Sequence, residues 1–314
     1  MKKSLLAMAV LGAFAGVASA QSSVTLYGRV DLAVGKNAGS AQKVMQNGSG
    51  SRLGLRGSED LGGGMSAFFN IEHRYNADTG AASDASRMWG GRSLVGLQGG
   101  FGKVSLGREY STAFLGSQLQ NDPWGWDTVA CSTGTCAITG LGIARVRNDS
   151  SLTYNFAASG FSFGAQVAEA TDTINNFQKK PFNMSLGYAA GPASINFGYE
   201  KTGQVAAAAA KVMTLGASFN LGAVKLGGSY GKGNTAANVD VKSYMLTATA
   251  PVGQGEFRAA IGQRETANKK DISLLALGYH YSLSKRTTVY ADFARNSKLA
   301  TEKTAYDFGL KHNF

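Results

Sequence analysis

The chain has 314 residues, a formal net charge of +11, 42 glycines and only 4 prolines. Glycine is nearly twice its usual share of about 7%, yet proline and low-complexity sequence are too scarce for collagen or a disordered linker. After residue 20, no apolar stretch reaches the roughly 18 residues of a membrane-spanning helix. The lysines and arginines are scattered rather than clustered, which argues against nucleic-acid binding.

Residues 1–20 have the pattern of a cleavable secretory signal peptide. Lys2 and Lys3 precede an apolar run, and Ala18-Ser19-Ala20 supplies small residues before Gln21. A membrane anchor is the competing interpretation, but the run is too short to span about 30 Å. Removal of these residues would leave a mature chain of 294 residues, 21–314, with a charge of +9.

The mature chain alternates apolar and polar residues in segments of about ten. In 304–314, Tyr306, Phe308 and Leu310 share one face, whereas Asp307 and Lys311 lie on the other. A soluble sandwich also alternates. Three features instead favour a membrane barrel: tight links alternate with longer polar loops, aromatic residues gather toward strand ends, and the spacing stays regular throughout.

This pattern predicts an all-β fold, a 16-stranded antiparallel transmembrane β-barrel that occupies residues 21–314. An even count places both chain ends on the same side. A barrel of this size is too wide for side chains to fill, so its lumen holds water. The expected strands are 23–35, 50–59, 64–76, 88–98, 102–110, 148–157, 161–170, 181–190, 193–202, 211–220, 223–232, 241–250, 255–265, 271–282, 287–296 and 304–314.

One connection, at about 111–147, breaks the rhythm. Loops longer than about 12 to 15 residues in a compact fold are usually functional or disordered. This one contains Phe114, Leu119, Trp124 and Ile138, too many apolar residues for a solvated tail. We therefore expect the loop to fold inward and narrow the lumen.

The same loop carries the only two cysteines, Cys131 and Cys136. Beyond the inner membrane the environment is oxidising, which favours a disulfide that closes a small ring. A metal site is the alternative, but it lacks further ligands, because His73, His280 and His312 are distant in sequence. We expect neither a metal nor a cofactor.

Alternation also places several arginines. Arg52 and Arg56 alternate with Leu53 and Leu55 and are expected to face the lumen, as is Arg74. An outward arginine near the bilayer midplane would cost about 2 to 4 kcal/mol. Basic residues are thus predicted to line the water-filled interior.

The sequence resembles the general porins of Gram-negative bacteria over essentially all of residues 21–314. No single stretch is specific, but together they are: 23–28 (SVTLYG), 51–64 (SRLGLRGSEDLGGG), 95–102 (VGLQGGFG), 106–108 (LGR), 147–150 (RNDS), 283–287 (LSKRT) and Phe314.

The resemblance implies that a third loop folds into the barrel with acidic groups, opposite a wall of arginines. It assigns Arg52, Arg108 and Arg147 to the basic wall, and Asp122 and Asp127 to the acidic side. Trp124 stands where many relatives have an acid. Simple alternation puts Arg108 on the face of Val104 and Leu106, and a bulge at Gly107 or a position beyond the hydrocarbon zone would reconcile the two.

The expected function is passive diffusion of small hydrophilic solutes and ions, with weak anion preference, across the cell outer membrane. A channel selective for organic acids or phosphate is the alternative. A barrel enzyme is a distant one, because no histidine falls beside a nucleophile motif. The resemblance further implies a homotrimer in contact with outer-membrane lipids and lipopolysaccharide, and terminal Phe314 as a signal to the barrel assembly machinery.

Overall fold

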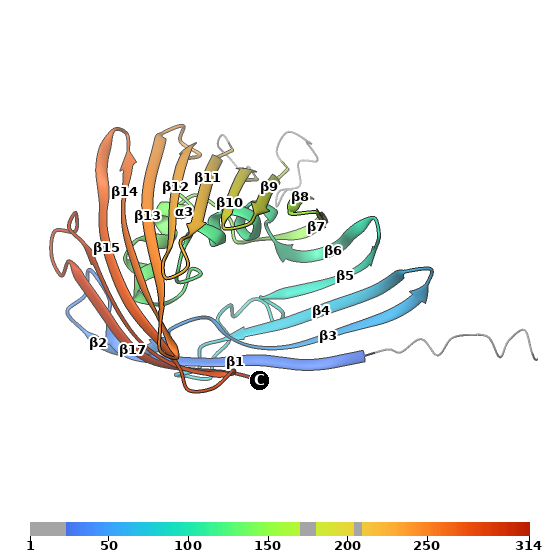
Figure 1. Ribbon diagram of the computed structural model, residues 1–314, viewed down its shortest axis with the longest axis horizontal. Coiled ribbons are helices and arrows are strands. Elements are labelled where there is room, and N and C mark those ends of the chain that lie inside the picture. Colours follow the sequence, from blue (N-terminus) through green and yellow to red (C-terminus); the bar gives the residue numbers. More distant parts are fainter. Residues whose placement is uncertain (1–22, 170–179, 204–208) are drawn as a thin grey trace, which may run out of the picture.

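The computed structural model describes residues 23–169, 180–203 and 209–314. The expected signal peptide therefore lies outside the described residues. The chain forms one continuous antiparallel sheet that curls into a barrel, with short helices inside it (Figure 1). Among the described residues, no helix is long and apolar enough to cross a membrane.

The strands follow the predicted ranges closely. They are β1 Ser23–Lys36, β2 Lys43–Asn47, β3 Ser51–Gly62, β4 Met65–Tyr75, β5 Arg92–Gly99, β6 Gly102–Tyr110, β7 Arg147–Ala158, β8 Phe161–Ala168, β9 Phe182–Ala190, β10 Ala193–Lys201, β11 Lys211–Asn220, β12 Lys225–Asn234, β13 Asp240–Val252, β14 Gly255–Thr266, β15 Lys269–Ser282, β16 Thr287–Asn296 and β17 Thr304–Asn313.

The barrel closes because β1 pairs with β17. On its other edge, β1 pairs with β3 over its first half and with β2 over its second half, so β2 and β3 fill one wall position between them. The 17 strands of the described residues thus make a barrel of 16, and the predicted count is confirmed. The short strand β2, separated from β3 by 48–50, was not predicted.

One end of the barrel carries short connections and the other carries most of the long ones. Residues 63–64, 100–101, 159–160, 191–192 and 253–254 make the tight turns of what we call the turn end. The loop end has one exception, the two-residue turn between β14 and β15. Ala267 and Asn268 there both have positive φ, 51° and 60°, as a type I′ hairpin requires.

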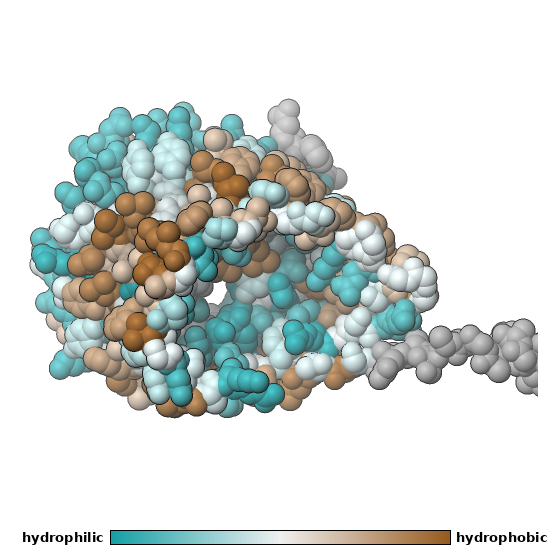
Figure 2. Space-filling view, viewed as in Figure 1, coloured by the Kyte–Doolittle hydropathy of each residue, from teal (hydrophilic) through white to brown (hydrophobic). Residues whose placement is uncertain are grey.

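The two faces of the wall differ as the alternation predicts. Large apolar side chains lie exposed on the outer face, such as Leu246 at 63% and Ile261 at 54%, which are paired across β13 and β14. Hydrophilic residues gather around an opening through the molecule, while apolar residues cover much of the wall (Figure 2). This is the arrangement of a barrel that is apolar outside and wet within.

The loop between β6 and β7 lies inside the barrel, as predicted. It contains a π-helix at Phe114–Gln118, a 3₁₀ helix at Leu119–Asn121, and two α-helices, α2 Thr128–Thr133 and α3 Thr135–Thr139. Figure 1 shows these helices within the ring of strands. The lumen is therefore narrowed by the chain itself.

An apolar cluster fixes this loop to the inner wall of β13–β16. Trp124, Ala130 and Ile138 of the loop pack against wall residues that would otherwise face water, Met245, Ala260, Ile272, Leu274, Ala276 and Ala294. A hydrogen bond also fixes the orientation of the loop on the wall, because Trp124 Nε1 donates to Asp292 Oδ1 at 2.7 Å. The loop thus covers an apolar patch on the inner face of β13–β16.

Candidate functional site: the basic wall of the lumen

Three arginines stand side by side on adjacent strands of the inner wall. Arg29 of β1 is opposite Arg52 of β3, which is opposite Arg74 of β4. Like charges directly across strands repel one another. We call these residues the arginine row. Three adjacent guanidinium groups give this part of the lumen a positive potential.

Tyr110, the last residue of β6, ties further arginines to the row. Its hydroxyl accepts from Arg74 Nη2 at 2.6 Å and also from Arg147 Nη2. The guanidinium of Arg147 lies 4.1 Å from the centre of the Tyr110 ring, and that of Arg92 lies 4.8 Å from it. The ring thus holds these cations in place by cation–π contacts.

Two acids partly compensate this charge. Glu72 of β4 accepts from Arg74 Nε at 2.7 Å and from the Tyr27 hydroxyl at 3.1 Å. Arg92 is paired with Glu109 at 2.8 Å. By contrast, the hydrogen bond of the Arg52 guanidinium is to the carbonyl of Gly50, at 3.0 Å. The wall therefore keeps a positive excess.

Asp127, at the start of α2, is the loop acid beside the arginine row. Its Oδ2 lies 3.6 Å from Arg29 Nη1, and its side chain is 24% exposed. Burial raises the pKa of Asp127 to about 6, although Arg29, Arg52 and Lys311 act to lower it. The loop is seated here because the next residue, Thr128, donates its N–H to the carbonyl of Gly48 at 2.6 Å.

Asp122, the other expected acid, does not reach the basic wall. Its carboxylate accepts from the N–H groups of Trp124 at 2.9 Å and Trp126 at 3.3 Å, and from Thr135 Oγ1 at 2.7 Å. The residue is 5% exposed, and burial raises its pKa to about 6. Asp122 stabilises the turn of the loop, because it accepts hydrogen bonds from N–H groups that would otherwise be buried without a partner.

Arg108 is likewise not part of the cluster. It pairs with Ser93 on the face that carries Leu106 and Val95, which are outward and more than half exposed. The bulge between Gly107 and Glu109 does not turn it inward. Its guanidinium instead bonds Asp149 at 2.6 Å and the carbonyl of Gly90 at 2.9 Å, toward the loop end.

The remaining predicted residues fall in three places. Arg56 faces the lumen four positions nearer the turn end than Arg52, with its guanidinium 5.2 Å from the Tyr27 ring centre. Cys131 and Cys136 form a disulfide within the loop. Phe314 exchanges backbone hydrogen bonds with Gly28, at 3.0 and 3.1 Å, and so extends the closure of the barrel.

Sequence reasoning missed Arg29, Glu72 and Tyr110. Arg29 could have been found by alternation, because it continues the inward series of Thr25 and Tyr27. Tyr110 gave no such signal, since it ends its strand. Within the described ranges, no group of three or more histidine, cysteine, aspartate or glutamate residues could hold a metal.

A closed 16-stranded barrel with an internal loop and a basic wall defines a membrane channel. Comparison with known proteins agrees: residues 7–300 match the family described as Gram-negative porin. The chain belongs to this family, and it is an outer-membrane diffusion channel.

Particular relatives are similar along nearly their whole length. Outer membrane porin protein 32 of Delftia acidovorans is 34% identical over 94% of this chain and 89% of its own. An outer membrane porin protein of Bordetella pertussis is 29% identical over the whole of both chains. The solved anion-selective porin from Comamonas acidovorans covers 94% of this chain and 100% of its own, with 29% identity and a TM-score of 0.78.

A more distant structure shares the fold alone. The trimer form of OmpT of Vibrio cholerae is 14% identical, with a TM-score of 0.71, and covers 93% of this chain and 99% of its own. In porins of this architecture the short turns face the periplasm. The turn end of this barrel is accordingly the periplasmic end.

Proposed function

We propose that this porin prefers anions weakly and that the arginine row, together with Arg147, sets the preference. The observation that carries the proposal is the register, which puts Arg29, Arg52 and Arg74 side by side in the narrowed lumen. Uncompensated positive charge on a low-dielectric wall raises the local concentration of anions. The similarity to a protein described as an anion-selective porin supports the same direction.

The internal loop supplies negative charge opposite the arginine row. Asp127 beside Arg29 makes charges of both signs meet where the internal loop faces the basic wall. Such a field orders water and favours polar solutes that can align with it, without any tight binding. Anions gain from the basic excess, and neutral hydrophilic solutes still pass.

The test is the reversal potential of single channels in a salt gradient. Wild-type protein should show a chloride preference over potassium. Arg52→Gln should lower the permeability ratio by about fivefold at most, because one charge at 4 Å in water is worth about 1 kcal/mol. Arg108→Gln, on the outward face, is the matched control and should leave the ratio unchanged. A cation preference in the wild type would overturn the proposal.

Assembly as a homotrimer is part of the proposal. It is supported by the likeness to a porin solved in trimer form. We further propose that Phe314 serves as the assembly signal, because it directly follows β17, the strand that closes the barrel on β1, and bonds Gly28 of β1. Deleting Phe314 should reduce the yield of folded protein but not the conductance of the channels that insert.

A further inference from the structure

A second basic pocket lies on the same wall, below the arginine row and toward the periplasm. Its lining includes Arg56, Phe68, Asn70, Leu94 and Lys103. Lys103 is the second residue of β6, directly after the tight turn at 100–101, and it pairs with Gln98 of β5. A solute leaving the row toward the periplasm would therefore meet this pocket next.

A cation and an aromatic ring are in contact in this pocket, as they are at Tyr110. Lys103 Nζ lies 4.1 Å from the centre of the Phe68 ring. The ring lies close against the wall, since a Cβ at Gly96 would come within 2.4 Å of Phe68 Cζ. Glycine at 96 thus creates the space for the ring, which supports the ammonium group from one side and leaves its other donors open to the lumen.

Two of the three cations of this pocket, Arg56 and Lys103, have no ion-pair partner in the described residues. Within the part of the chain that the structure describes, no carboxylate oxygen lies within 4.0 Å of the Arg56 or Lys103 nitrogens. The third cation, Arg92, is paired with Glu109 at 2.8 Å. Glu109 also lines the pocket and attracts Lys103 electrostatically, but its carboxylate is bonded to Arg92. The pocket therefore offers two cations without a bonded acid, next to the apolar surfaces of Phe68 and Leu94.

We propose that this pocket binds small organic carboxylates that carry an apolar group. The carboxylate lies between Arg56 and Lys103, and the hydrocarbon part lies against Phe68. Charge-assisted hydrogen bonds hold the anion, and contact with the ring discriminates it from chloride. The proposal rests on the anion preference above and names the solute class that gains most from it.

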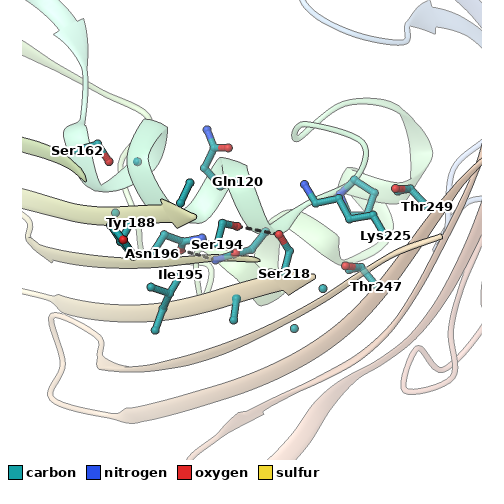
Figure 3. Close-up of a pocket in the computed structure, with 18 of the residues that line it drawn as sticks. Gln120, Ser162, Tyr188, Ser194, Ile195, Asn196, Ser218, Lys225, Thr247 and Thr249 are labelled. Atoms are coloured by element: carbon teal, nitrogen blue, oxygen red, sulfur yellow. Dashed lines mark hydrogen bonds between the residues drawn. The ribbon is translucent and has the colours of Figure 1, made fainter. Parts of the chain in front are cut away.

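The opposite wall provides a natural comparison. A pocket there, between the internal loop and the inner wall, is lined in part by hydroxyl groups, including those of Ser194, Ser218, Thr247 and Thr249 (Figure 3). Ser194 Oγ and Ser218 Oγ are hydrogen-bonded at 2.8 Å. Its lysine, Lys225, has no aromatic ring beneath it within the described residues. Lys225 thus matches Lys103 in charge and in nearness to the periplasmic turns, but not in surroundings.

Single-channel currents with benzoate, acetate and chloride test the proposal. Millimolar benzoate added on the periplasmic side should interrupt the current, whereas acetate at the same concentration should do so far less. Lys103→Gln should weaken the benzoate block by about fivefold or more, the loss of roughly 1 kcal/mol. Phe68→Leu should weaken the block by benzoate but not the passage of chloride. Lys225→Gln should leave both unchanged.

Two results would overturn the proposal: benzoate that blocks no more than acetate, or a Lys225→Gln channel that loses as much block as Lys103→Gln. Reversal potentials recorded in the same bilayers separate this failure from that of the anion preference. If the preference is present and block is absent, only the pocket fails. If block persists without any preference, the pocket stands and the role of the arginine row fails.

Discussion

The arginine row places like charges where cross-strand pairing makes them repel. Two acids offset this repulsion in part: Glu72 bonds Arg74 at 2.7 Å, and Asp127 lies 3.6 Å from Arg29. The arginine row thus lowers the stability of the fold locally, and in return it makes the electrostatic potential of the lumen positive. Tyr110 limits the cost, since its ring and hydroxyl fix Arg74 and Arg147 without neutralising them.

The charge of Asp127 should make selectivity depend on pH. Its pKa is raised to about 6, so the carboxyl is ionised at neutral pH and becomes neutral as the pH falls through 6. Loss of this negative charge beside Arg29 should raise the chloride preference, by about fivefold at most. Reversal potentials between pH 7.5 and 4.5 measure the change.

Asp127→Asn is the matched control for that titration. The variant should show the high chloride preference already at pH 7.5, with no further rise near pH 6. An unchanged titration in Asp127→Asn would show that another group is responsible.

Alternation predicted the inward position of Arg52, Arg56 and Arg74 from the sequence, because a strand leaves each side chain only two directions. It also pointed outward for Arg108, and the structure agrees with alternation rather than with the family motif. Asp122 could not be placed by such reasoning. Its position depends on three hydrogen bonds inside an irregular loop, which no periodicity describes.

At the scale of elements, the internal loop shows what composition can and cannot predict. Its apolar residues predicted that it would fold inward, and the structure shows Trp124 and Ile138 buried against the wall. The sequence did not indicate which wall would receive them. That information is in the small and apolar inward residues of β13–β16, such as Met245 and Ala260, which look like exceptions to alternation until the loop covers them.

Weakening this anchor should widen and loosen the pore. Ile138→Ala removes buried atoms from the cluster, a change that typically costs about 2 to 5 kcal/mol, which here is lost from the energy that holds the loop to the wall. We expect a larger single-channel conductance and a noisier open state, with the barrel still folded.

Ile195→Ala is the control, because it removes the same atoms from an outward position that is 49% exposed. Its conductance should equal that of the wild type. Equal conductance of Ile138→Ala and wild type would mean that the loop does not depend on this contact.

At the scale of the whole molecule, a single rule, apolar outside and polar inside, predicted the closed barrel and its strand count. The break between β2 and β3 escaped prediction, because both pair with β1 and β2 has only 5 residues. The expected alternation of short and long connections also fails once, because the tight turn at Ala267 and Asn268 lies at the loop end.

The two faces should respond oppositely to the same substitution. Leu246→Arg puts a charge on the outer wall near the middle of β13, where it should cost about 2 to 4 kcal/mol and reduce folded yield. Thr247→Arg, one residue along and lining the lumen, should fold normally. Resistance of the folded barrel to detergent denaturation in gels measures both.

Both the diffusion of solutes and its selectivity require that the barrel enclose a continuous water-filled path narrowed by its own loop. Swelling of liposomes that contain the purified protein tests it most directly, with a pentose, a hexose and a disaccharide at equal osmolarity. We expect swelling rates that fall steeply with solute size and rise in proportion to concentration without saturation. Rates no higher than in protein-free liposomes, or rates that saturate, would contradict it.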